Sequence, residues 1–437
     1  MTISRPWGRA ALWLAGLGPF FFASYGFATW LTTQRDQVGS MVFAWERVIP
    51  FMPWTIIPYW SIDILYGISL FICASRAELD IHARRLLTAQ IVAVTCFILF
   101  PLTFTFARPE ADGFAGLLFE FLGKFDKPFN QAPSLHIALL VILWDRFARH
   151  VPDATRWILH GWFALIGVSV LTTFQHHFVD VPTGAWLGFL CLWLWPEQTA
   201  SPLMAARWTD DPKRRRLAGC YAIGGVALGG IAPWIGGNAL WLLWPAASCW
   251  LVAGNYALFG VTGFQKSAAG QTSVAAQWLL APYTAAAWIN ARMWTRGTPL
   301  AVPIADGVFL GRLPSRREAQ IGVGIVDLTA ELPRPDRAPG DTASYYAVPM
   351  LDLIVPPPEA LRLAVERIER ARAMGPVLVC CALGYGRSAA AVTAWLLHTG
   401  RVADIDDAIA QVRRARPRMV LDGHVRAAIV IANGSGR

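Results

Sequence analysis

A cysteine and an arginine, separated by five residues, lie in the run Cys381-Ala-Leu-Gly-Tyr-Gly-Arg387-Ser388. The β-rich run from Val377 to Cys381 precedes this loop, and an apolar stretch with a helical pattern follows it. A strand, a loop and a helix in this order point several backbone N–H groups inward and add the positive end of the helix, which together bind an anion such as phosphate. The same field favours the thiolate of Cys381, the form that attacks phosphorus. The spacing therefore predicts phosphoryl transfer through a cysteine.

The neighbouring residues of the loop have roles that this reaction requires. Arg387 would grip two phosphoryl oxygens through its guanidinium fork. Ser388 would donate a hydrogen bond to the sulfur while the phosphocysteine breaks down, and Gly384 and Gly386 would bind the phosphate. The predicted reaction needs no metal or other cofactor.

The leaving group of such a reaction needs a proton donor. Asp352 follows the β-rich run from Tyr345 to Met350, precedes a proline-rich loop and stands 29 residues before the cysteine. Asp336 and Asp341 are weaker candidates, because they fall in the preceding loop. We therefore expect Asp352 to be the general acid.

The composition places much of the chain in a membrane. Of its 437 residues, 55% are hydrophobic and only 15% are charged, which is too apolar for an ordinary soluble domain. A helix that spans a bilayer needs roughly 20 mostly apolar residues. Eight such segments are predicted, at residues 11–33, 53–75, 87–107, 133–150, 156–174, 178–196, 217–235 and 239–260.

The loops between these segments predict the orientation in the membrane. The loops on one side carry most of the Arg and Lys residues, among them Arg84, Arg85 and the run from Lys213 to Arg216, so the positive-inside rule places the N-terminus in the cytosol. An even number of spans returns the C-terminus to the cytosol, where a reactive thiol stays reduced. Because these basic residues lie where they meet lipid headgroups, the net charge of +9 does not indicate nucleic-acid binding.

The stretch from Val274 to Trp294 is apolar but interrupted by Gln277, Pro282 and Asn290. Its tryptophans favour a helix in the headgroup region over a ninth span, which would put the C-terminal domain on the other side. After Pro299, four β-rich runs alternate with helical stretches, which is typical of an α/β domain. These predicted strands are Val308 to Gly311, Gly324 to Leu328, Tyr345 to Met350 and Val377 to Cys381. The predicted organisation is a membrane domain over 1–200, two additional transmembrane helices over 201–262, an interfacial linker helix over 263–297 and the α/β domain over 298–437.

A second group of chemically active residues lies at the outer ends of predicted spans. Arg108 follows the third span, Ser134 and His136 open the fourth, and His176 and Asp180 lie between the fifth and sixth. An antiparallel bundle brings them together, and ionisable groups at such a place are costly without a function. They allow phosphoryl transfer through histidine, in which His176 attacks phosphorus, Asp180 orients its imidazole and His136 protonates the leaving group. Arg108 and Ser134 would hold the phosphate.

From about Ala305 onward the sequence resembles a dual-specificity phosphatase of the protein tyrosine phosphatase superfamily. The resemblance rests on the Cys-x5-Arg-Ser loop, the Asp352 loop, the run Val326-Asp-Leu-Thr-Ala-Glu331 and the helix end Arg413-Arg-Ala-Arg416-Pro417. It implies the fold and the cysteine chemistry of that superfamily. The family usually has a histidine where this chain has Cys380. We expect Cys380 to pack in the core, and a disulfide with an oxidised Cys381 is the alternative.

The loop side chains Ala382, Leu383 and Tyr385 carry no positive charge, unlike members of the family that bind polyphosphorylated inositols with lysines. A multiply charged headgroup is therefore disfavoured as substrate. A phospholipid monophosphate such as phosphatidylglycerophosphate and a phosphoprotein remain as alternatives.

Residues 50–197 resemble the type 2 phosphatidic acid phosphatase superfamily, through Pro-Ser134-x-His136 and His176-x3-Asp180. This chain lacks two charged residues of the hydrolase pattern. Pro101 stands where the first motif of the family has a lysine, and Val170 stands where the third motif has an arginine. Similar losses occur in the branch that contains inositolphosphoryl- and phosphocholine-ceramide transferases. His177 is the alternative nucleophile.

The resulting hypothesis is a bifunctional, integral membrane phosphatase without cofactors. Its cytosolic domain hydrolyses phosphomonoesters, and its histidine site, facing the periplasm of a bacterial inner membrane, hydrolyses lipid phosphate. The alternatives for the membrane domain are a headgroup phosphotransferase and a non-catalytic, lipid-sensing anchor. The expected partners are the lipid bilayer and a phospholipid phosphate or phosphoprotein substrate, with no nucleic acid.

Overall fold

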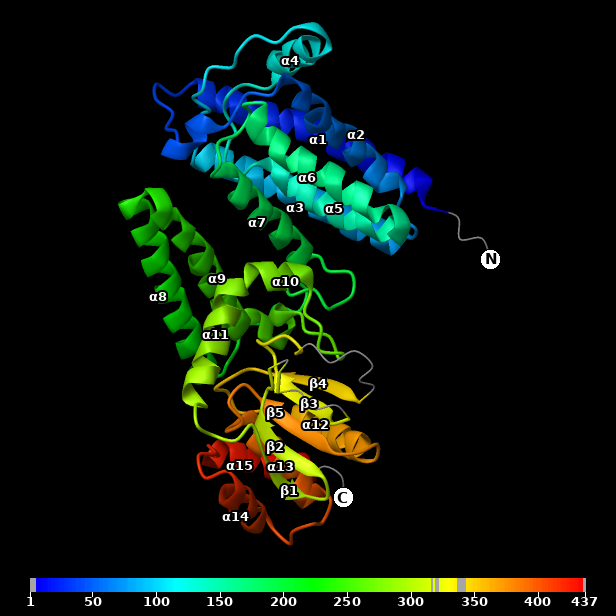
Figure 1. Cartoon of the computed structure of the whole chain (residues 1–437), viewed down its shortest axis with the longest axis vertical. Coiled ribbons are helices and arrows are strands. Elements are labelled where there is room, and N and C mark those ends of the chain that lie inside the picture. The colour runs from blue at the N-terminus through cyan, green and yellow to red at the C-terminus, as the bar shows by residue number, and fades with distance from the viewer. Residues whose placement is uncertain (1–4, 316, 319–321, 336–342, 435–437) are drawn as a thin grey trace. The chain divides into compact units, whose positions relative to one another are not determined.

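The computed structural model describes residues 5–315, 317–318, 322–335 and 343–434. Their contacts divide the chain into two compact units, Met1–Gln198 and Thr199–Arg437. The first unit is a bundle of helices that run alongside one another, except that the helix Gly113–Phe125 lies apart at one end (Figure 1). These are α1 (Trp7–Thr33), α2 (Ile56–Phe71), α3 (Arg76–Leu99), α4 (Gly113–Phe125), α5 (Leu135–His150), α6 (Arg156–Thr172) and α7 (Asp180–Leu194).

Apolar side chains form both the core and the outer surface of this bundle. Ile142 and Phe163 are buried between helices, whereas Phe22 and Ile64 are exposed. Helices that are apolar on all sides are typical of segments in lipid.

Helices occupy all eight positions at which spans are predicted. In the part of the chain that the structure describes, five are long and apolar enough to cross a membrane: Trp7–Thr33, Arg76–Leu99, Asp153–Thr172, Pro212–Ile235 and Gly237–Phe264. The other three predicted spans form α2, α5 and α7, with 16, 16 and 15 residues. These are shorter than the roughly 20 residues of a typical span.

The prediction of the third span at 87–107 is wrong at both ends. The helix α3 already begins at Arg76, because the Ser75 hydroxyl accepts a hydrogen bond from the N–H of Glu78 at 3.2 Å. The Glu78 carboxylate in turn accepts one from a preceding backbone N–H at 2.6 Å, a reciprocal arrangement like that of a capping box. The helix ends before Pro101, which cannot supply the N–H that a further turn needs.

Four helices precede the sheet of the second unit: α8 (Pro212–Ile235), α9 (Leu243–Gly254), α10 (Val274–Leu279) and α11 (Ala281–Trp294). The segment predicted as one interfacial helix is therefore two helices. The break lies at Leu280, and Pro282 occupies the first turn of α11, where its missing N–H costs nothing. Ala291 of α11 is buried in one apolar cluster with Leu378 and Cys380 of the sheet.

A five-stranded sheet forms the centre of the α/β domain, in the order β1-β2-β5-β3-β4. β1 is antiparallel to β2, and the other neighbouring pairs are parallel. The four predicted strands and the α/β class are confirmed. The strands are β1 (Ala301–Ala305), β2 (Val308–Arg312), β3 (Gly324–Thr329), β4 (Tyr345–Met350) and β5 (Val377–Cys381).

The strand β1 is missing from the sequence prediction. It forms a hairpin with β2 through Asp306 and Gly307, whose φ angles of 46° and 78° are both positive. Asp-Gly is a preferred pair for such a two-residue turn, because it tolerates this backbone conformation. The hairpin covers the edge of β2 that would otherwise be open.

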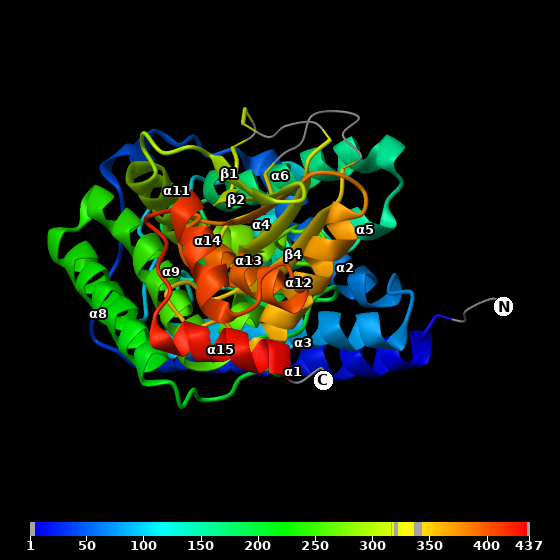
Figure 2. The ribbon, with the colours of Figure 1, turned by 90° about the horizontal axis from the view of Figure 1, so that it is seen from below.

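The helices α12 (Pro358–Arg372), α13 (Arg387–His398), α14 (Ile405–Ala415) and α15 (Gly423–Gly434) gather on one side of the sheet (Figure 2). The core on this face includes Val379 of β5 and Trp395 of α13. Because β5 is the central strand and α13 follows it directly, the loop between them lies at the carboxyl edge of the parallel strands. Ligands of open α/β sheets bind at this edge.

A buried lysine ties the segment before the sheet to the domain. The Lys266 ammonium forms an ion pair with Asp327 of β3 and donates hydrogen bonds to the hydroxyl and carbonyl of Thr329, at 2.8 and 2.9 Å, and to the carbonyl of Leu332 at 2.7 Å. The side chains of Lys266 and Asp327 are fully buried. Removing one partner of such a pair leaves the other charge without compensation.

We expect Lys266→Ala to destabilise the domain by about 3–5 kcal/mol, because it leaves the Asp327 carboxylate buried without its ion-pair partner. Hydrogen exchange of the β3 amide groups measures the change. Arg216→Ala, at an exposed arginine of the same unit, should change their protection by less than about 0.5 kcal/mol. Equal protection in the Lys266 variant and the wild type would contradict this role.

Candidate active site

The strand β5 ends at Cys381, and its thiol lies under the loop that leads to α13. The sulfur accepts a hydrogen bond from the N–H of Gly384 at 3.3 Å and lies 3.3 Å from the hydroxyl of Ser388. Cys381 is 3% exposed. The structure thus brings together the predicted nucleophile, one loop glycine and the predicted hydrogen-bond donor.

The conformation of this loop depends on Gly384. Its φ angle is 76°, and a Cβ atom at this position would lie 2.6 Å from the carbonyl carbon of Gly311 and 2.8 Å from the nitrogen of Arg312. Both are backbone atoms of β2, so they cannot move aside cheaply. At Gly386, by contrast, an added Cβ atom would meet open space, and this residue caps the N-terminus of α13.

A buried arginine outside the loop supports it from behind. The Arg416 guanidinium donates to the carbonyl of Leu383 at 3.4 Å and lies over the ring of Tyr385, 5.1 Å from its centre. Its other nitrogen donates to the carbonyl of Pro299 at 2.8 Å. The helix end that carries Arg416 thus contacts two loop residues.

Arg387 is buried, and its guanidinium fork binds a carboxylate of the protein. Its two terminal nitrogens donate to the two oxygens of Glu331 at 2.8 and 2.6 Å, and one also donates to the carbonyl of Met350 at 2.9 Å. The sequence predicted this fork for phosphate, and Glu331, just after β3, was not predicted as a site residue. Among the described residues, Nε of Arg387 has no hydrogen-bond partner.

The charges of this group shift the pKa of each member. Burial alone would raise the pKa of Glu331, but the Arg387 charge and hydrogen bonds outweigh it and lower that pKa. Burial alone would lower the pKa of Arg387, but the Asp352 and Glu331 carboxylates raise it well above its ordinary value. The pair is therefore charged on both sides.

Asp352 lies beside the same arginine. One carboxylate oxygen is 3.0 Å from a terminal nitrogen of Arg387, and the side chain is 36% exposed. Burial raises the pKa of Asp352 above its ordinary value; the Arg387 charge opposes this shift and the Glu331 charge adds to it. A raised pKa suits a carboxyl that must donate a proton. Asp336 and Asp341, the weaker candidates, lie outside the described residues.

The adjacent cysteines point to opposite faces of the sheet, because side chains alternate along a strand. Cys381 belongs to the core under α12–α15, whereas Cys380 packs with Ile325 and Leu378 on the other face. Both are free thiols. Burial raises the pKa of Cys380 well above its ordinary value, and the Asp327 charge adds to the shift. These facts favour the packing role of Cys380.

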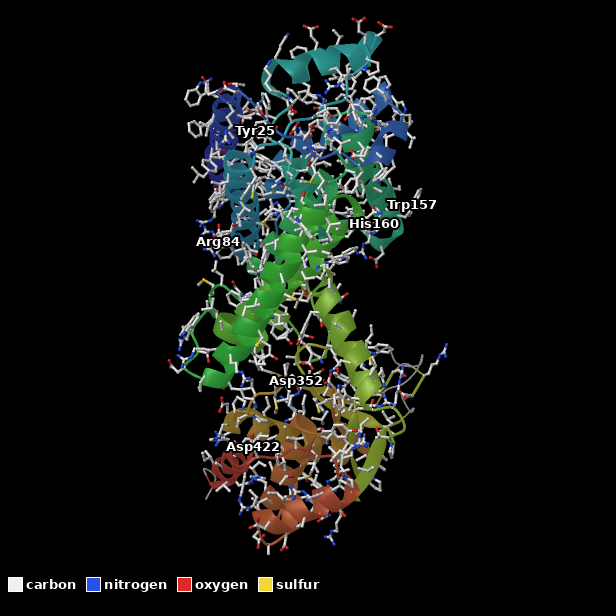
Figure 3. All side chains as sticks on the ribbon, turned by 90° about the vertical axis from the view of Figure 1, so that its left-hand side faces the viewer. Tyr25, Arg84, Trp157, His160, Asp352 and Asp422 are labelled. Atoms are coloured by element: carbon white, nitrogen blue, oxygen red, sulfur yellow. The ribbon has the colours of Figure 1, made fainter. Side chains whose placement is uncertain are left out.

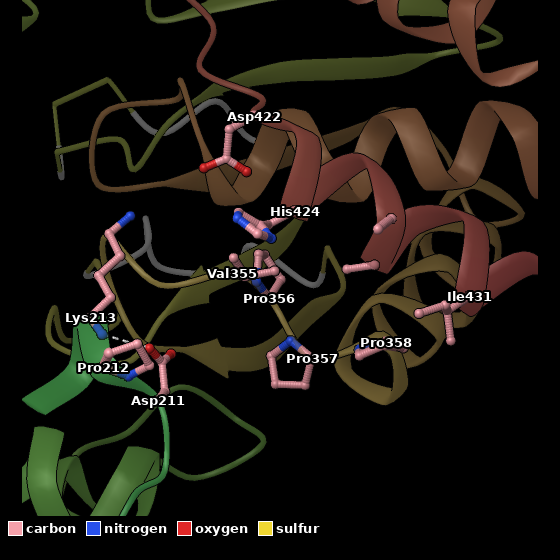
Figure 4. A pocket seen from close by; sticks show the side chains of 12 residues that line it. Asp211, Pro212, Lys213, Val355, Pro356, Pro357, Pro358, Asp422, His424 and Ile431 are labelled. Carbon is pink, nitrogen blue, oxygen red and sulfur yellow. Dashed lines mark hydrogen bonds between the residues drawn. The ribbon is translucent and has the colours of Figure 1, made fainter.

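A pocket of about 580 Å³ lies beside the loop that follows Asp352 (Figure 4). Its walls are the start of α8, the proline-rich loop and α15. Cys381 and Arg387 do not line it. The lining includes Asp211, Lys213, Val355, Pro356, Pro357, Asp422, His424 and Ile431.

The helical unit brings together three of its predicted site residues. The Ser134 hydroxyl lies 3.1 Å from Nε2 of His176, and Nδ1 of His176 lies 3.1 Å from the Asp180 carboxylate. Ser134 caps the N-terminus of α5, and Asp180 begins α7. Asp180 also accepts a hydrogen bond from the N–H of His177 at 3.0 Å. This chain of contacts fixes the imidazole of His176 from both ends.

The other two predicted residues of this site have different partners. Arg108 donates to the carbonyls of Thr173 and Phe174, both at 3.2 Å. The His136 ring stacks on the ring of Tyr59 at 4.2 Å, and its Nε2 has no hydrogen-bond partner in the described part of the chain.

The alternative nucleophile, His177, is held by a residue that the sequence analysis missed. Its Nδ1 lies 3.0 Å from the carboxylate of Glu46, and its Nε2 accepts from the N–H of Thr105 at 3.1 Å. Both ring nitrogens of His177 therefore have protein partners.

We expect Gly384→Ala to lower kcat/KM for p-nitrophenyl phosphate by about 100-fold, because the added methyl group displaces the loop above the sulfur by a fraction of an ångström or more. Gly423→Ala is the matched control, since its methyl group would meet open space at an ordinary φ. Thermal unfolding curves of both variants show whether the domain remains folded. Full activity of a folded Gly384 variant would contradict the steric argument.

Comparisons with known proteins match one part of the chain. Among solved structures, Tk-PTP in its active form shares 27% identity over 32% of this chain and 99% of its own, with a TM-score of 0.28. Human DUSP28 shares 28% identity over 31% and 95%, with a TM-score of 0.27. PTPMT1 in complex with PI(5)P shares 16% over 31% and 96%, with a TM-score of 0.26. No curated protein matches the chain significantly.

The family model that matches the chain is described as "Dual specificity phosphatase, catalytic domain", and it covers residues 313–431. These residues include Asp352, Cys381, Arg387 and Ser388. The chain therefore contains a dual specificity phosphatase domain, and this supports phosphatase activity.

Proposed function

We propose that the chain is a membrane-bound phosphatase whose C-terminal domain hydrolyses phosphomonoesters through a phosphocysteine. The observation that carries this proposal is the group around Cys381. Its sulfur meets a loop N–H and the Ser388 hydroxyl, and a paired Arg387 lies in the same loop beside Asp352.

In the first step, the Cys381 thiolate attacks phosphorus, an S–P bond forms and the bond to the leaving oxygen breaks. Asp352 gives its proton to that oxygen. Two of the five N–H groups of Arg387 can serve the phosphate without disturbing its hydrogen bonds to Glu331 and to the carbonyl of Met350: the one on Nε and the one on the terminal nitrogen that contacts Asp352. Asp352 must leave that nitrogen, and the same movement takes it toward the leaving group.

In the second step, water attacks phosphorus and the S–P bond breaks. The Asp352 carboxylate takes a proton from the water, and the thiolate of Cys381 is released. The Ser388 hydroxyl, 3.3 Å from the sulfur, stabilises the developing negative charge by a hydrogen bond. Inorganic phosphate then leaves the loop.

The apolar helices support attachment to a bilayer. We place both termini in the cytosol because of the basic residues in the loops on that side and, in a bacterium, the chain in the inner membrane. Attachment raises the effective concentration of the domain toward membrane substrates. A phospholipid monophosphate is the first candidate substrate, and a membrane phosphoprotein is the second. The uncharged loop side chains favour a single phosphate over a polyphosphorylated headgroup.

A second activity is supported by the contacts of His176 in the helical unit. With Nδ1 next to Asp180, its Nε2 is the nitrogen that would attack phosphorus, and Ser134 lies beside that nitrogen to hold a phosphate oxygen. We propose lipid phosphate hydrolysis through a phosphohistidine. The alternatives are transfer of the headgroup to an alcohol and a non-catalytic, lipid-sensing anchor.

We expect Cys381→Ser to abolish phosphate release from p-nitrophenyl phosphate by the detergent-solubilised chain, because serine does not form an anion at neutral pH. Asp352→Asn should lower kcat for phenyl phosphate, whose leaving group needs a proton, by about 100-fold. With that substrate the wild-type rate should fall as pH rises through the raised pKa of Asp352, since the acid then loses its proton, and Asp352→Asn should remove this limb of the profile. Activity that survives Cys381→Ser would exclude the proposed nucleophile.

We expect His176→Ala to abolish the phosphate release from phosphatidic acid that a Cys381→Ser chain retains, and to leave the p-nitrophenyl phosphate activity of the Cys381 site unchanged in the otherwise wild-type chain. His160→Ala, at a histidine of α6 that bonds only to Trp144 among the described side chains, is the matched control. Labelled phospholipid, assayed with and without an alcohol acceptor, separates hydrolysis from transfer. Unchanged lipid turnover in His176→Ala would leave the helical unit as an anchor.

A further inference from the structure

The loop that carries Asp352 contacts a helical residue from outside the phosphatase domain. The hydroxyl of Tyr256 donates a hydrogen bond to the backbone carbonyl of Asp352 at 3.1 Å. Tyr256 is 1% exposed and follows α9, in the segment that precedes the sheet. Figure 3 places Asp352 on the side of the α/β domain that faces these helices. The contact therefore reaches the general acid from a part of the chain that the family model does not cover.

The backbone at Asp352 needs such support. The next residue, Leu353, has a φ angle of 61°, and its side chain is exposed. A bulky residue rarely adopts a positive φ, and it persists in one only where surrounding contacts impose it. The carbonyl that accepts the Tyr256 hydrogen bond belongs to the peptide unit that joins Asp352 to Leu353, so this bond acts directly on the unusual turn.

Tyr256 is itself held firmly. It lies in the π-helical turn Asn255–Phe259, a local irregularity of a kind that is frequent at functional sites. Its carbonyl accepts a hydrogen bond from Nε of Arg214 at 2.9 Å, and its ring stacks on that of Tyr221 with centres 5.7 Å apart. Both partners are on α8. The hydroxyl is therefore presented from a fixed ring.

The loop that carries Glu331, the other carboxylate beside Arg387, is also hydrogen-bonded to the segment that precedes the sheet. The Thr284 hydroxyl of α11 donates to the carbonyl of Glu331 at 3.4 Å, and Lys266 donates to the carbonyl of Leu332. Both carboxylates that contact Arg387 thus lie in loops that are bonded to residues 256–284. The helices before the domain support the polar surroundings of Arg387 as well as the acid.

We propose that Tyr256 is a positioning residue of the phosphatase reaction, which holds the Asp352 loop so that its carboxyl reaches the leaving oxygen. The inference rests on the proposed function and deepens it, because it makes the helices α8 and α9 part of the phosphatase machinery. Tyr256 does not touch the reacting atoms. It acts through the backbone of Asp352, so its loss should weaken general acid catalysis and leave attack by Cys381 intact.

The test uses the detergent-solubilised full chain and two substrates that differ in their need for an acid. The p-nitrophenolate ion is a good leaving group and departs without a proton, whereas phenolate needs one. Tyr256→Phe should lower kcat for phenyl phosphate by about 10-fold and kcat for p-nitrophenyl phosphate by less than about 2-fold. Tyr283→Phe is the control: its ring packs edge-on against Tyr221 in the same aromatic cluster, and it should leave the ratio of the two rates unchanged.

A double mutant separates positioning from general loss of structure. If Tyr256 acts only through Asp352, Tyr256→Phe added to Asp352→Asn should cost no further activity on phenyl phosphate. Equal losses on both substrates, or additive losses in the double mutant, would overturn the inference. Failure of the proposed function looks different, because Cys381→Ser would then retain activity whatever happens at Tyr256.

Discussion

The buried charge of Arg387 constrains the rest of the phosphatase domain. An arginine that is 4% exposed is unfavourable unless carboxylates and carbonyls compensate it. Glu331 after β3 and Asp352 after β4 supply this compensation, and Arg387 itself opens the helix after β5. Three parallel strands must therefore end side by side. The sheet order β5-β3-β4 satisfies this requirement, which links the topology of the domain to its reaction.

The sequence predicted the parts of the site whose spacing is short, and two residues that a neighbouring element marks. Cys381 and Arg387 share one loop, and His176 and Asp180 lie four residues apart just before and at the start of α7, so local geometry was enough to associate them. Asp352 was found because it follows a predicted strand, and Ser134 because it opens a predicted helix. Glu331 and Glu46 were missed, because each meets its partner only through the fold, 56 and 131 positions away in the sequence. Carboxylates at such distances look like any other acidic residue in a sequence.

The sequence also predicted most elements of the fold, but not all of their ends. Alternation of apolar runs located four strands and the helices of both units, whereas the edges depended on local signals that were overlooked. The Asp306-Gly307 pair indicates the hairpin between β1 and β2. Ser75 and Glu78 indicate that α3 begins at Arg76. The break at Leu280 likewise has a local signal in Pro282. The contacts of Lys266 could not be predicted in this way, since they depend on how the chain packs against β3.

The contacts of Arg387 also suggest how substrate binding and proton transfer are coupled. Asp352 and a phosphate would compete for the same terminal nitrogen, while Glu331 keeps the rest of the fork. In the proposed reaction, binding of phosphate would displace Asp352 from its ion pair, and loss of the positive neighbour would raise the pKa of Asp352 further. Asp352 would then be the protonated donor while a phosphate occupies the loop. Tyr256 holds the backbone of Asp352 during this change, so the carboxyl can turn while its loop stays in place.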